Sequence, residues 1–420
     1  MNWENIENLL DAYTQYKHYQ QLFDSKGWPK KNSREAMKDL LIKGVKDPGF
    51  INAAMNLSEF EEWLVLHQID GNNYTFVYSL QTKPELEVLE DLYNRKNEIV
   101  TRIWEFNPNI SSDDDNQVLT NLNEIVLVDI HRNEERGKYI YSFLAPCQVY
   151  GKTVSGLQKI HKKLFFAHCV LFKDSNELRV VINPTSHLID VNGVEKDKGD
   201  WTPIANTFYF KMKEFIGEHL LIAPLWLPLA LHKLAEDASS HNNADITSQS
   251  VNAEDDIREF AEALLLKAGL DPEKDLAMTL HLAQDIQNSF EAQLIEKYGI
   301  IKGDNPFELF KQRIDGVSHT INVESRETLR GGAAAQAARK SRQNNDIDLL
   351  GVTLNTNERI YKFLVEQGTD AYLIRGSKNV FIEEEVVNSV IRKLNEYRDE
   401  IQPSFSSDPN NVGTDPVIAS

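Results

Sequence analysis

Basic and small polar side chains between residues 26 and 38 are better suited to bind an anion than any others in this sequence. From Lys17 to Lys46 there are eight Lys or Arg and three Asp or Glu, a local charge of +5, whereas the 420-residue chain carries −19. A basic segment on an acidic chain favours selective contact with a polyanion such as nucleic acid. The residue types in this segment therefore predict phosphate binding.

Two short helices joined by an extended turn are expected to position these side chains. The first helix is indicated by aromatic residues at helical spacing, namely Tyr13, Tyr16, Tyr19 and Phe23. Gly27 stops this helix, and Pro29 favours an extended path for the residue before it. Asn32 or Ser33 caps the second helix. Lys30 and Lys31 then precede a helix start, where free N–H groups and the helix dipole favour a phosphate.

This segment resembles the SAP motif, a helix–extended–helix module that binds DNA. The residues that carry the resemblance are Gly27-Trp28-Pro29, Asn32-Ser33, Arg34 and the apolar Met37, Leu40 and Leu41. The family pattern has Leu after the Gly and Gly at the position of Asn32, so the match is approximate. It covers residues 13–45. The predicted nucleic-acid-binding residues are Lys26, Trp28, Lys30, Lys31, Asn32, Ser33, Arg34 and Lys38. The alternative is a solvated helical hairpin whose lysines serve solubility.

A second basic patch lies in an Ala-rich segment between residues 325 and 343. Its cations are Arg326, Arg330, Arg339, Lys340 and Arg342, against one Glu. Gly331 and Gly332 favour a flexible basic linker. A segment that becomes ordered on nucleic acid or on an acidic partner is the alternative.

Other patterns that can carry chemistry are weak, and we predict no catalytic residue, metal site or cofactor. Gly151-Lys152-Thr153 follows a predicted strand, but Pro146 stands where a phosphate-binding loop needs a glycine. His168 and Cys169 lie on opposite faces of a predicted strand, so they cannot share a metal. Asp190 and Glu195, with Lys196 and Lys198, faintly resemble a nuclease carboxylate–lysine arrangement. Asn192-Gly193 between them indicates a hairpin turn instead.

The length and the hydrophobic periodicity indicate an α+β protein with two or three domains. Few helices separate the predicted strands between residues 122 and 215, so a mainly antiparallel sheet is expected there. We expect a helical N-terminal domain with the SAP-like hairpin at 1–110, a β-rich core domain at 120–236, a linker at 237–256, a helical segment at 257–324, a basic flexible segment at 325–345, a small α+β domain at 346–401 and a disordered tail at 402–420. Finer expectations are a strand at 207–210, a helix at 357–367, and strands at 371–375 and 379–383.

The composition indicates the cellular compartment in which the protein works. Its two cysteines, Cys147 and Cys169, argue against a disulfide framework and favour a reducing compartment, so we expect a cytoplasmic protein. No N-terminal signal peptide is visible. The longest apolar run, Leu220 to Leu231, is interrupted by Pro224 and Pro228 and is too short to span a bilayer, so no membrane partner is expected.

Three classes of function remain. The first is a non-enzymatic DNA-binding accessory or adaptor protein, for example in genome maintenance or phage defence, with further protein partners. The second is a protein–protein scaffold without nucleic acid. The third is a nuclease-type enzyme whose dispersed active site lies in the β-rich domain.

Overall fold

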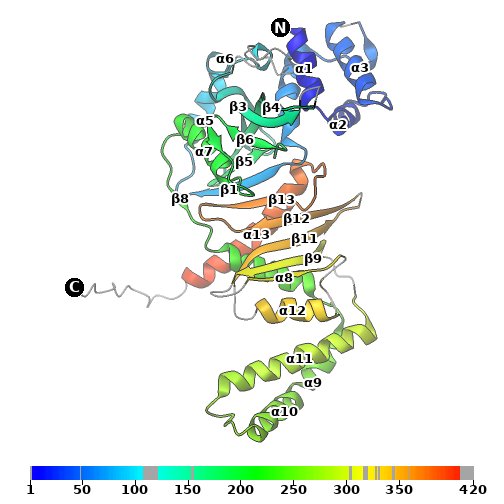
Figure 1. The fold of residues 1–420 in the computed structure, drawn as a ribbon, viewed down its shortest axis with the longest axis vertical. Helices are drawn as coiled ribbons and strands as arrows, with labels where there is room; N and C mark the ends of the chain where they lie inside the picture. Colours follow the sequence, from blue (N-terminus) through cyan, green and yellow to red (C-terminus); the bar gives the residue numbers. More distant parts are fainter. Residues whose placement is uncertain are drawn as a thin grey trace, which may run out of the picture. The chain divides into compact units, whose positions relative to one another are not determined.

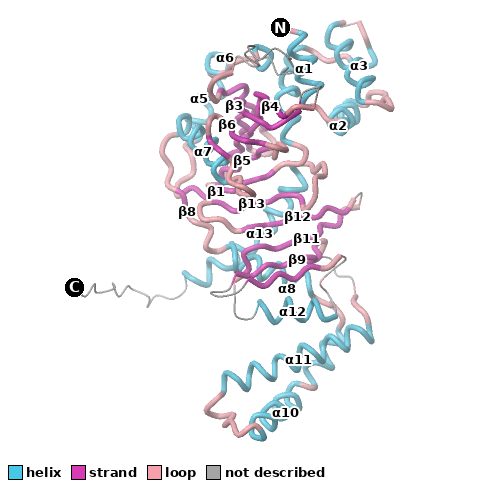
Figure 2. Tube along the Cα trace, viewed as in Figure 1, coloured by secondary structure: helices cyan, strands magenta, loops and turns pink. Residues whose placement is uncertain are grey.

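The computed structural model describes residues 2–47, 49–106, 122–152, 156–301, 305–315, 320–326, 329, 332–342, 346–357 and 359–406. The chain divides into two units. The first consists of Met1–Pro224 with Gly368–Asn388, and the second of Leu225–Gln367 with Ser389–Ser420. Both contain helices and antiparallel strands, so the predicted α+β class is confirmed (Figures 1 and 2).

The first unit begins with helices whose ends are defined by polar caps. Asn2, Ser33 and Asn56 each accept a hydrogen bond from a backbone N–H in the first turn of the helix that follows. Such caps satisfy donors that a helix leaves unpaired at its start. The helices of this unit are α1 Trp3–Tyr13, α2 Tyr16–Lys26, α3 Arg34–Lys46, η1 Ile51–Ala53, α4 Leu57–Leu66, η2 His67–Ile69, α5 Leu86–Asn94, α6 Lys96–Ile99, η3 Ile103–Glu105 and α7 Thr202–Ile216.

An antiparallel sheet forms the centre of the first unit, in the order β13-β1-β5-β4-β3-β6-β7, with β2 also paired to β3 and β8 to β1. Its strands are β1 Tyr74–Leu80, β2 Val126–Asn133, β3 Lys138–Lys152, β4 Gln158–Phe172, β5 Glu177–Ile182, β6 Leu188–Val191, β7 Val194–Glu195, β8 Leu221–Ile222 and β13 Ala371–Gly376. The strands β3 and β4 have 15 residues each and pair along their whole length. This confirms the predicted antiparallel character.

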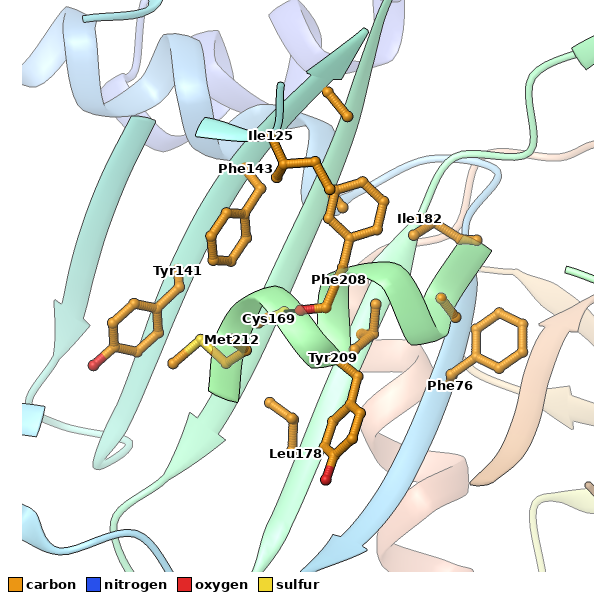
Figure 3. Packing of buried hydrophobic residues seen from close by; sticks show 14 of the residues in the cluster. Phe76, Ile125, Tyr141, Phe143, Cys169, Leu178, Ile182, Phe208, Tyr209 and Met212 are labelled. Atoms are coloured by element: carbon orange, nitrogen blue, oxygen red, sulfur yellow. Dashed lines mark hydrogen bonds between the residues drawn. The ribbon is translucent and has the colours of Figure 1, made fainter. Parts of the chain in front are cut away.

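Helix α7 covers one face of this sheet. Phe208 and Met212 point from α7 onto the strands, where they pack near Phe143 and Cys169 (Figure 3). The Cys169 thiol lies 3.8 Å from the carbonyl oxygen of Phe208. Because β-strand side chains alternate between faces, the residues two positions apart along β3 and β4 all reach this core. Burial accounts for most of the stability here.

The N-terminal helices cover the other face of the same sheet. Their cluster includes Leu10 of α1, Phe23 of α2 and Leu41 of α3, together with Leu144 of β3 and Phe166 of β4. The predicted N-terminal helical region and the predicted β-rich region therefore share one hydrophobic core and fall in the same unit.

The second unit pairs its strands in the order β10-β9-β11-β12. Phe310, Leu349 and Leu364 form a small cluster between three of them. The elements are α8 Leu227–Ser239, α9 Ala244–Asn252, α10 Glu254–Lys267, α11 Leu276–Tyr298, β9 Phe307–Asp315, β10 Thr320–Glu324, α12 Gly332–Arg342, β11 Ile347–Asn355 and β12 Ile360–Glu366. Helix α13, Glu384–Ser406, begins in the first unit and continues into the second.

Several finer expectations differ from the structure. The segment 207–210 lies inside helix α7, and the predicted helix at 357–367 is strand β12. Strand β13 matches the prediction at 371–375, whereas within 379–383 only Ile382 forms an isolated bridge, with Gly71. The predicted linker at 237–256 is largely helical, and strands β9 and β10 lie in the predicted helical segment. Helix α12 occupies part of the segment expected to be flexible, and α13 continues to Ser406 within the expected tail.

Candidate nucleic-acid interface

The α2–α3 hairpin has a well-defined turn. Gly27 adopts φ of 65°, the left-handed region that favours glycine, and it ends α2. The N–H of the next residue, Trp28, donates to the carbonyl of Phe23 at 2.8 Å. At the other end of the loop, the Ser33 hydroxyl accepts the N–H of Ala36 at 3.1 Å. Two helices joined by a short extended segment are therefore present, with Ser33 as the cap.

Side chains of α2 hold the loop in place. Trp28 packs edge-to-face on Phe23, with ring centroids 5.4 Å apart, and is half-buried against the helical core. Its ring therefore serves packing, although it was included among the predicted DNA-binding residues. The Tyr16 hydroxyl donates to the carbonyl of Lys31 at 2.7 Å. The loop conformation is thus fixed by the protein itself.

Most cations of this hairpin pair with carboxylates. Asp11, at the end of α1, lies 2.7 Å from Lys38 and 3.5 Å from Arg34. The remaining pairs are Lys26 with Glu59, Lys30 with Asp24 at 2.5 Å, and Lys46 with Glu7 at 3.2 Å. Adding the acidic partners from outside the segment, Glu7, Asp11 and Glu59, lowers the local charge from +5 to +2. The basic character counted along the sequence is therefore much weaker in three dimensions.

Lys31 and Asn32 are the predicted contacts that stay most available. Both side chains are exposed and lie directly before the first turn of α3. Among the residues that the structure describes, no carboxylate pairs with Lys31. A helix start leaves backbone N–H groups unpaired, and these attract an anionic oxygen. The start of α3 is therefore the part of the hairpin best placed to receive a phosphate.

The second basic patch is tied to acidic neighbours within its own unit. Arg339 pairs with Glu291 of α11 at 3.2 Å, Lys340 with Asp285 of α11 at 2.5 Å, and Arg342 with Glu236 of α8 at 2.8 Å. Arg342 also donates to the buried Gln312 of β9 at 2.8 Å. These cations attach α12 to its neighbours, so they are poorly placed to bind phosphate.

Arg326 and Arg330 complete the predicted patch. Arg326 follows strand β10, and its carbonyl accepts a hydrogen bond from Lys362 at 3.1 Å. Arg330 lies outside the described residues. The structure therefore brings together three of the five predicted residues on α12 and pairs each of them with a carboxylate.

A basic region that the sequence analysis did not single out lies on the β3–β4 hairpin. The chain from Arg136 to Lys173 contains no Asp or Glu. Beyond the part covered by other elements, the hairpin exposes Lys152, Lys162 and Lys163. No carboxylate among the described residues forms an ion pair with these three lysines. The absence of acidic residues is visible in the sequence and was the signal that could have found this region.

Hydrogen bonds connect the two hairpins. The backbone N–H of Leu164 on β4 donates to the Tyr13 hydroxyl at 3.0 Å. Thr14 follows Tyr13, and its carbonyl accepts a hydrogen bond from Arg34 at the start of α3, at 3.4 Å. Tyr13 also packs on Phe166, with ring centroids 4.9 Å apart. The start of α3 and the outer part of β4 therefore lie on the same side of the first unit.

Buried histidines beside this region have structural roles. His18 accepts the N–H of Gln15 at 3.0 Å and lies 3.0 Å from the carbonyl of Asp70. Burial lowers the pKa of His18 to about 4. Burial also raises the pKa of the Asp70 carboxyl to about 6, although the N–H of Glu384 donates to it at 2.7 Å. Since both ring nitrogens of His18 have partners within the protein, this ring is held in place.

A second buried histidine, His67, is also held by partners within the protein. His67 lies 2.9 Å from the Thr14 hydroxyl and 3.1 Å from the carbonyl of Trp63, and burial lowers its pKa. Perturbed titration is typical of catalytic groups, but buried structural groups show it too. Here the partners of the rings are backbone groups, the Thr14 hydroxyl and the Gln68 side-chain amide, which fits a structural role better.

The weak nuclease-like cluster is a turn. Asn192 and Gly193 have φ of 51° and 80°, as expected of a two-residue hairpin. The Asp190 carboxylate accepts the N–H of Gly193 at 3.2 Å, and Lys196 lies over the Trp201 ring at 4.7 Å. Within the described part of the chain, no group of three His, Cys, Asp or Glu side chains is placed to hold a metal ion.

Comparison with known proteins adds no relative from which a function can be transferred. No protein-family model matches the sequence, and the search of curated proteins finds no match either. In the described residues, no helix combines the length and apolar character needed to cross a membrane.

Proposed function

We propose that this protein is a non-enzymatic, cytoplasmic DNA-binding accessory protein that contacts backbone phosphates through the α2–α3 hairpin, in genome maintenance or phage defence. The observation that carries the proposal is the exposure of Lys31 and Asn32 directly before the capped start of α3. A phosphate at this position meets a lysine, an amide and unpaired backbone N–H groups together.

The paired cations act mainly as support in this proposal. Lys26, Arg34 and Lys38 hold the hairpin to Glu59 and Asp11. Lys30 is exposed, and its partner Asp24 belongs to the same hairpin, so a phosphate can compete for it. About two or three phosphates are then neutralised, and the logarithm of the affinity for duplex DNA falls by about 2 to 3 per tenfold rise in salt.

Fluorescence anisotropy with a labelled 20-base-pair duplex at two salt concentrations tests the proposal. Lys30→Glu/Lys31→Glu is expected to abolish salt-sensitive binding while leaving the melting temperature unchanged. The control is Lys267→Glu/Lys274→Glu, which makes the same charge change near the α10–α11 turn. Binding that survives the Lys30/Lys31 reversal contradicts the proposal. Equal losses in both double variants would mean that only net charge matters.

A protein–protein scaffold is the second candidate, and exposed apolar side chains on α10 and α11 favour it. Phe260 and Leu266 of α10, and Leu276, Met278 and Leu280 of α11, each expose about half of their surface or more. A group of exposed apolar residues on adjacent helices is typical of an interaction surface. Light scattering after size exclusion tests self-association. A dimer converted to monomer by Leu266→Glu/Leu280→Glu supports it, and a monomeric wild type excludes self-association through these helices.

A further inference from the structure

The outer part of the β3–β4 hairpin carries an exposed apolar pair flanked by polar side chains. Tyr150 of β3 lies directly opposite Ile160 of β4, and the two are 57% and 48% exposed. In an antiparallel pair, residues directly opposite each other lie on the same face. Lys152 opposite Gln158 and Gln148 opposite Lys162 are on this face as well. An aromatic ring thus stands between two lysines, one on each side along the ribbon.

The strand register places two acidic residues on this face, Asp190 of β6 and, opposite it and one strand further from β3, the exposed Glu195 of β7. Asp190 of β6 lies opposite Gln148, and its carboxylate is nearly buried and accepts the N–H of Gly193 at 3.2 Å. Neither Lys152 nor Lys162 forms an ion pair with any carboxylate of the described residues. On a chain with a net charge of −19, an aromatic and two unpaired lysines on one exposed face are complementary to a polyanion that also offers flat apolar surfaces.

Single-stranded DNA has both properties. In a duplex the flat faces of the bases are stacked on each other, whereas unpaired bases are free to stack on an aromatic side chain. We propose that the β3–β4 hairpin binds single-stranded DNA, with a base stacked on Tyr150 against Ile160 and the flanking phosphates contacted by Lys152 and Lys162. This inference rests on the proposed DNA-binding function and adds single-stranded DNA to the duplex DNA that the α2–α3 hairpin contacts.

The position of the hairpin agrees with this assignment. The hydrogen bonds from Leu164 to Tyr13 and from Arg34 to Thr14 put the start of α3 on the same side of the unit. A strand that leaves the β3–β4 hairpin on this side can reach the phosphate position before α3. The two basic regions then contribute to one binding surface, with the phosphate contacts shared and the base contact made only by the β3–β4 hairpin.

The test compares Tyr150→Ala and Tyr150→Phe with the wild-type full-length protein. The probes are fluorescein-labelled dT20 and a 20-base-pair duplex, measured by anisotropy at low salt. Tyr298→Ala is the matched control, because Tyr298 is similarly exposed on α11, at 42%. Since Tyr150 is exposed, the variants are expected to keep the wild-type melting temperature, which is checked first.

We expect Tyr150→Ala to weaken dT20 binding about tenfold, within the range of one lost stacking contact. Tyr150→Phe keeps the ring and is expected to stay within twofold of wild type, and duplex binding should change little in either variant. Equal dT20 affinity of wild type and Tyr150→Ala overturns the inference, while the proposed function stands if Lys30→Glu/Lys31→Glu still loses duplex binding. No binding of either probe by the wild type overturns both.

Discussion

The α2–α3 and β3–β4 hairpins are both rich in lysine, but they differ in whether the lysines are paired with carboxylates. On the α2–α3 hairpin, four of the predicted contact residues, Lys26, Lys30, Arg34 and Lys38, face a carboxylate at pairing distance. On the β3–β4 hairpin, Lys152, Lys162 and Lys163 have no such partner among the described residues. The first hairpin is a network of ion pairs, and the second is an exposed positive surface.

The difference shows that the charge available to a ligand is decided by tertiary neighbours. Glu7 and Asp11 come from α1 and Glu59 comes from α4, so a count along residues 17–46 leaves them out. The β3–β4 hairpin keeps its charge because its own strands contain no acidic residue and its outer part has few neighbours. Exposed ion pairs contribute little to stability, yet they compete directly with a phosphate for the same lysine.

Acidification tests a feature that the two hairpins share, and its effect should be the largest. His18 of α2 and His168 of β4 are both buried, and burial lowers the pKa of His168 to about 3. A histidine with a lowered pKa stabilises the fold above pH 6.5, and this stability is lost as the pH falls. The raised pKa of Asp70 acts in the opposite direction between about pH 4 and 6, and offsets much of the effect of His18.

His168 and the also buried His67, whose pKa burial lowers as well, should therefore determine most of the response to acid. From pH 6.5 to 4.5 we expect the burial of His168 to lower the free energy of unfolding by about 2 kcal/mol. Urea denaturation at the two pH values measures this cost. His168→Asn can keep a contact to Ser142 and has no group that titrates in this range, so its stability should fall less on acidification. An equal fall in both proteins would show that His168 does not take up a proton on unfolding.

The link between the hairpins should give the next largest effect. Tyr13→Phe removes the acceptor of the buried Leu164 N–H, and an unpaired buried donor costs about 1–3 kcal/mol. Tyr16→Phe is the matched control, because its hydroxyl bonds only an exposed loop carbonyl, and it should cost less than about 1 kcal/mol. Urea denaturation compares the two variants. An equal loss of unfolding free energy in both variants would mean that the hydrogen bond from Leu164 to Tyr13 does not stabilise β4.

Neutralising paired lysines on one hairpin and unpaired lysines on the other compares the contributions of the two hairpins to DNA binding. Lys152→Gln/Lys162→Gln should weaken dT20 binding about tenfold and flatten its salt dependence by up to about 1.4 in the logarithmic slope. Lys26→Gln/Lys38→Gln removes the same charge, but the lost cations were already paired, so we expect about a twofold change. Anisotropy across a salt series gives both numbers. A larger loss of dT20 affinity in Lys26→Gln/Lys38→Gln would mean that the α2–α3 hairpin, and not the β3–β4 hairpin, is the main binding surface.

Removing the carboxylate of Asp11, which pairs with both Arg34 and Lys38, should have the smallest effect. It should raise the affinity for DNA, whereas the lysine substitutions lower it. Asp11→Asn releases Arg34 and Lys38 from their partner, so duplex affinity at low salt should rise about two- to threefold, as expected for weak exposed ion pairs. Asp39→Asn changes the net charge equally on an exposed part of α3 and serves as the control. A rise of the same size in both variants would attribute the gain to net charge alone.

The sequence was sufficient for the fold class and for the turn of the α2–α3 hairpin. Gly27 and Ser33 act locally, and their conformational preferences do not depend on distant residues. It was insufficient for β12, whose seven residues are mostly apolar and interrupted only by Lys362 and Glu366, a pattern that also fits a short helix. Periodicity cannot separate the two over seven residues, and pairing with β11 decides the outcome.

Only part of the candidate site could be predicted, because the sequence shows local signals but not tertiary contacts. Exposure of Lys31 and Asn32 follows from their place before a helix cap. The partners of Lys26, Arg34 and Lys38 depend on contacts with α1 and α4, which no local pattern reveals. Tyr150 and Ile160 become a pair only through the β3–β4 register, although the acid-free stretch around them is visible in the sequence.

The two cysteines give the protein a practical property. Cys147 and Cys169 are both buried in the sheet core, and burial raises the pKa of each thiol, that of Cys147 to about 12. A thiol that stays protonated and buried reacts slowly with maleimides or oxidants. A single cysteine introduced on the exposed ribbon, for example Lys162→Cys, should therefore accept a fluorophore selectively without removal of the native thiols.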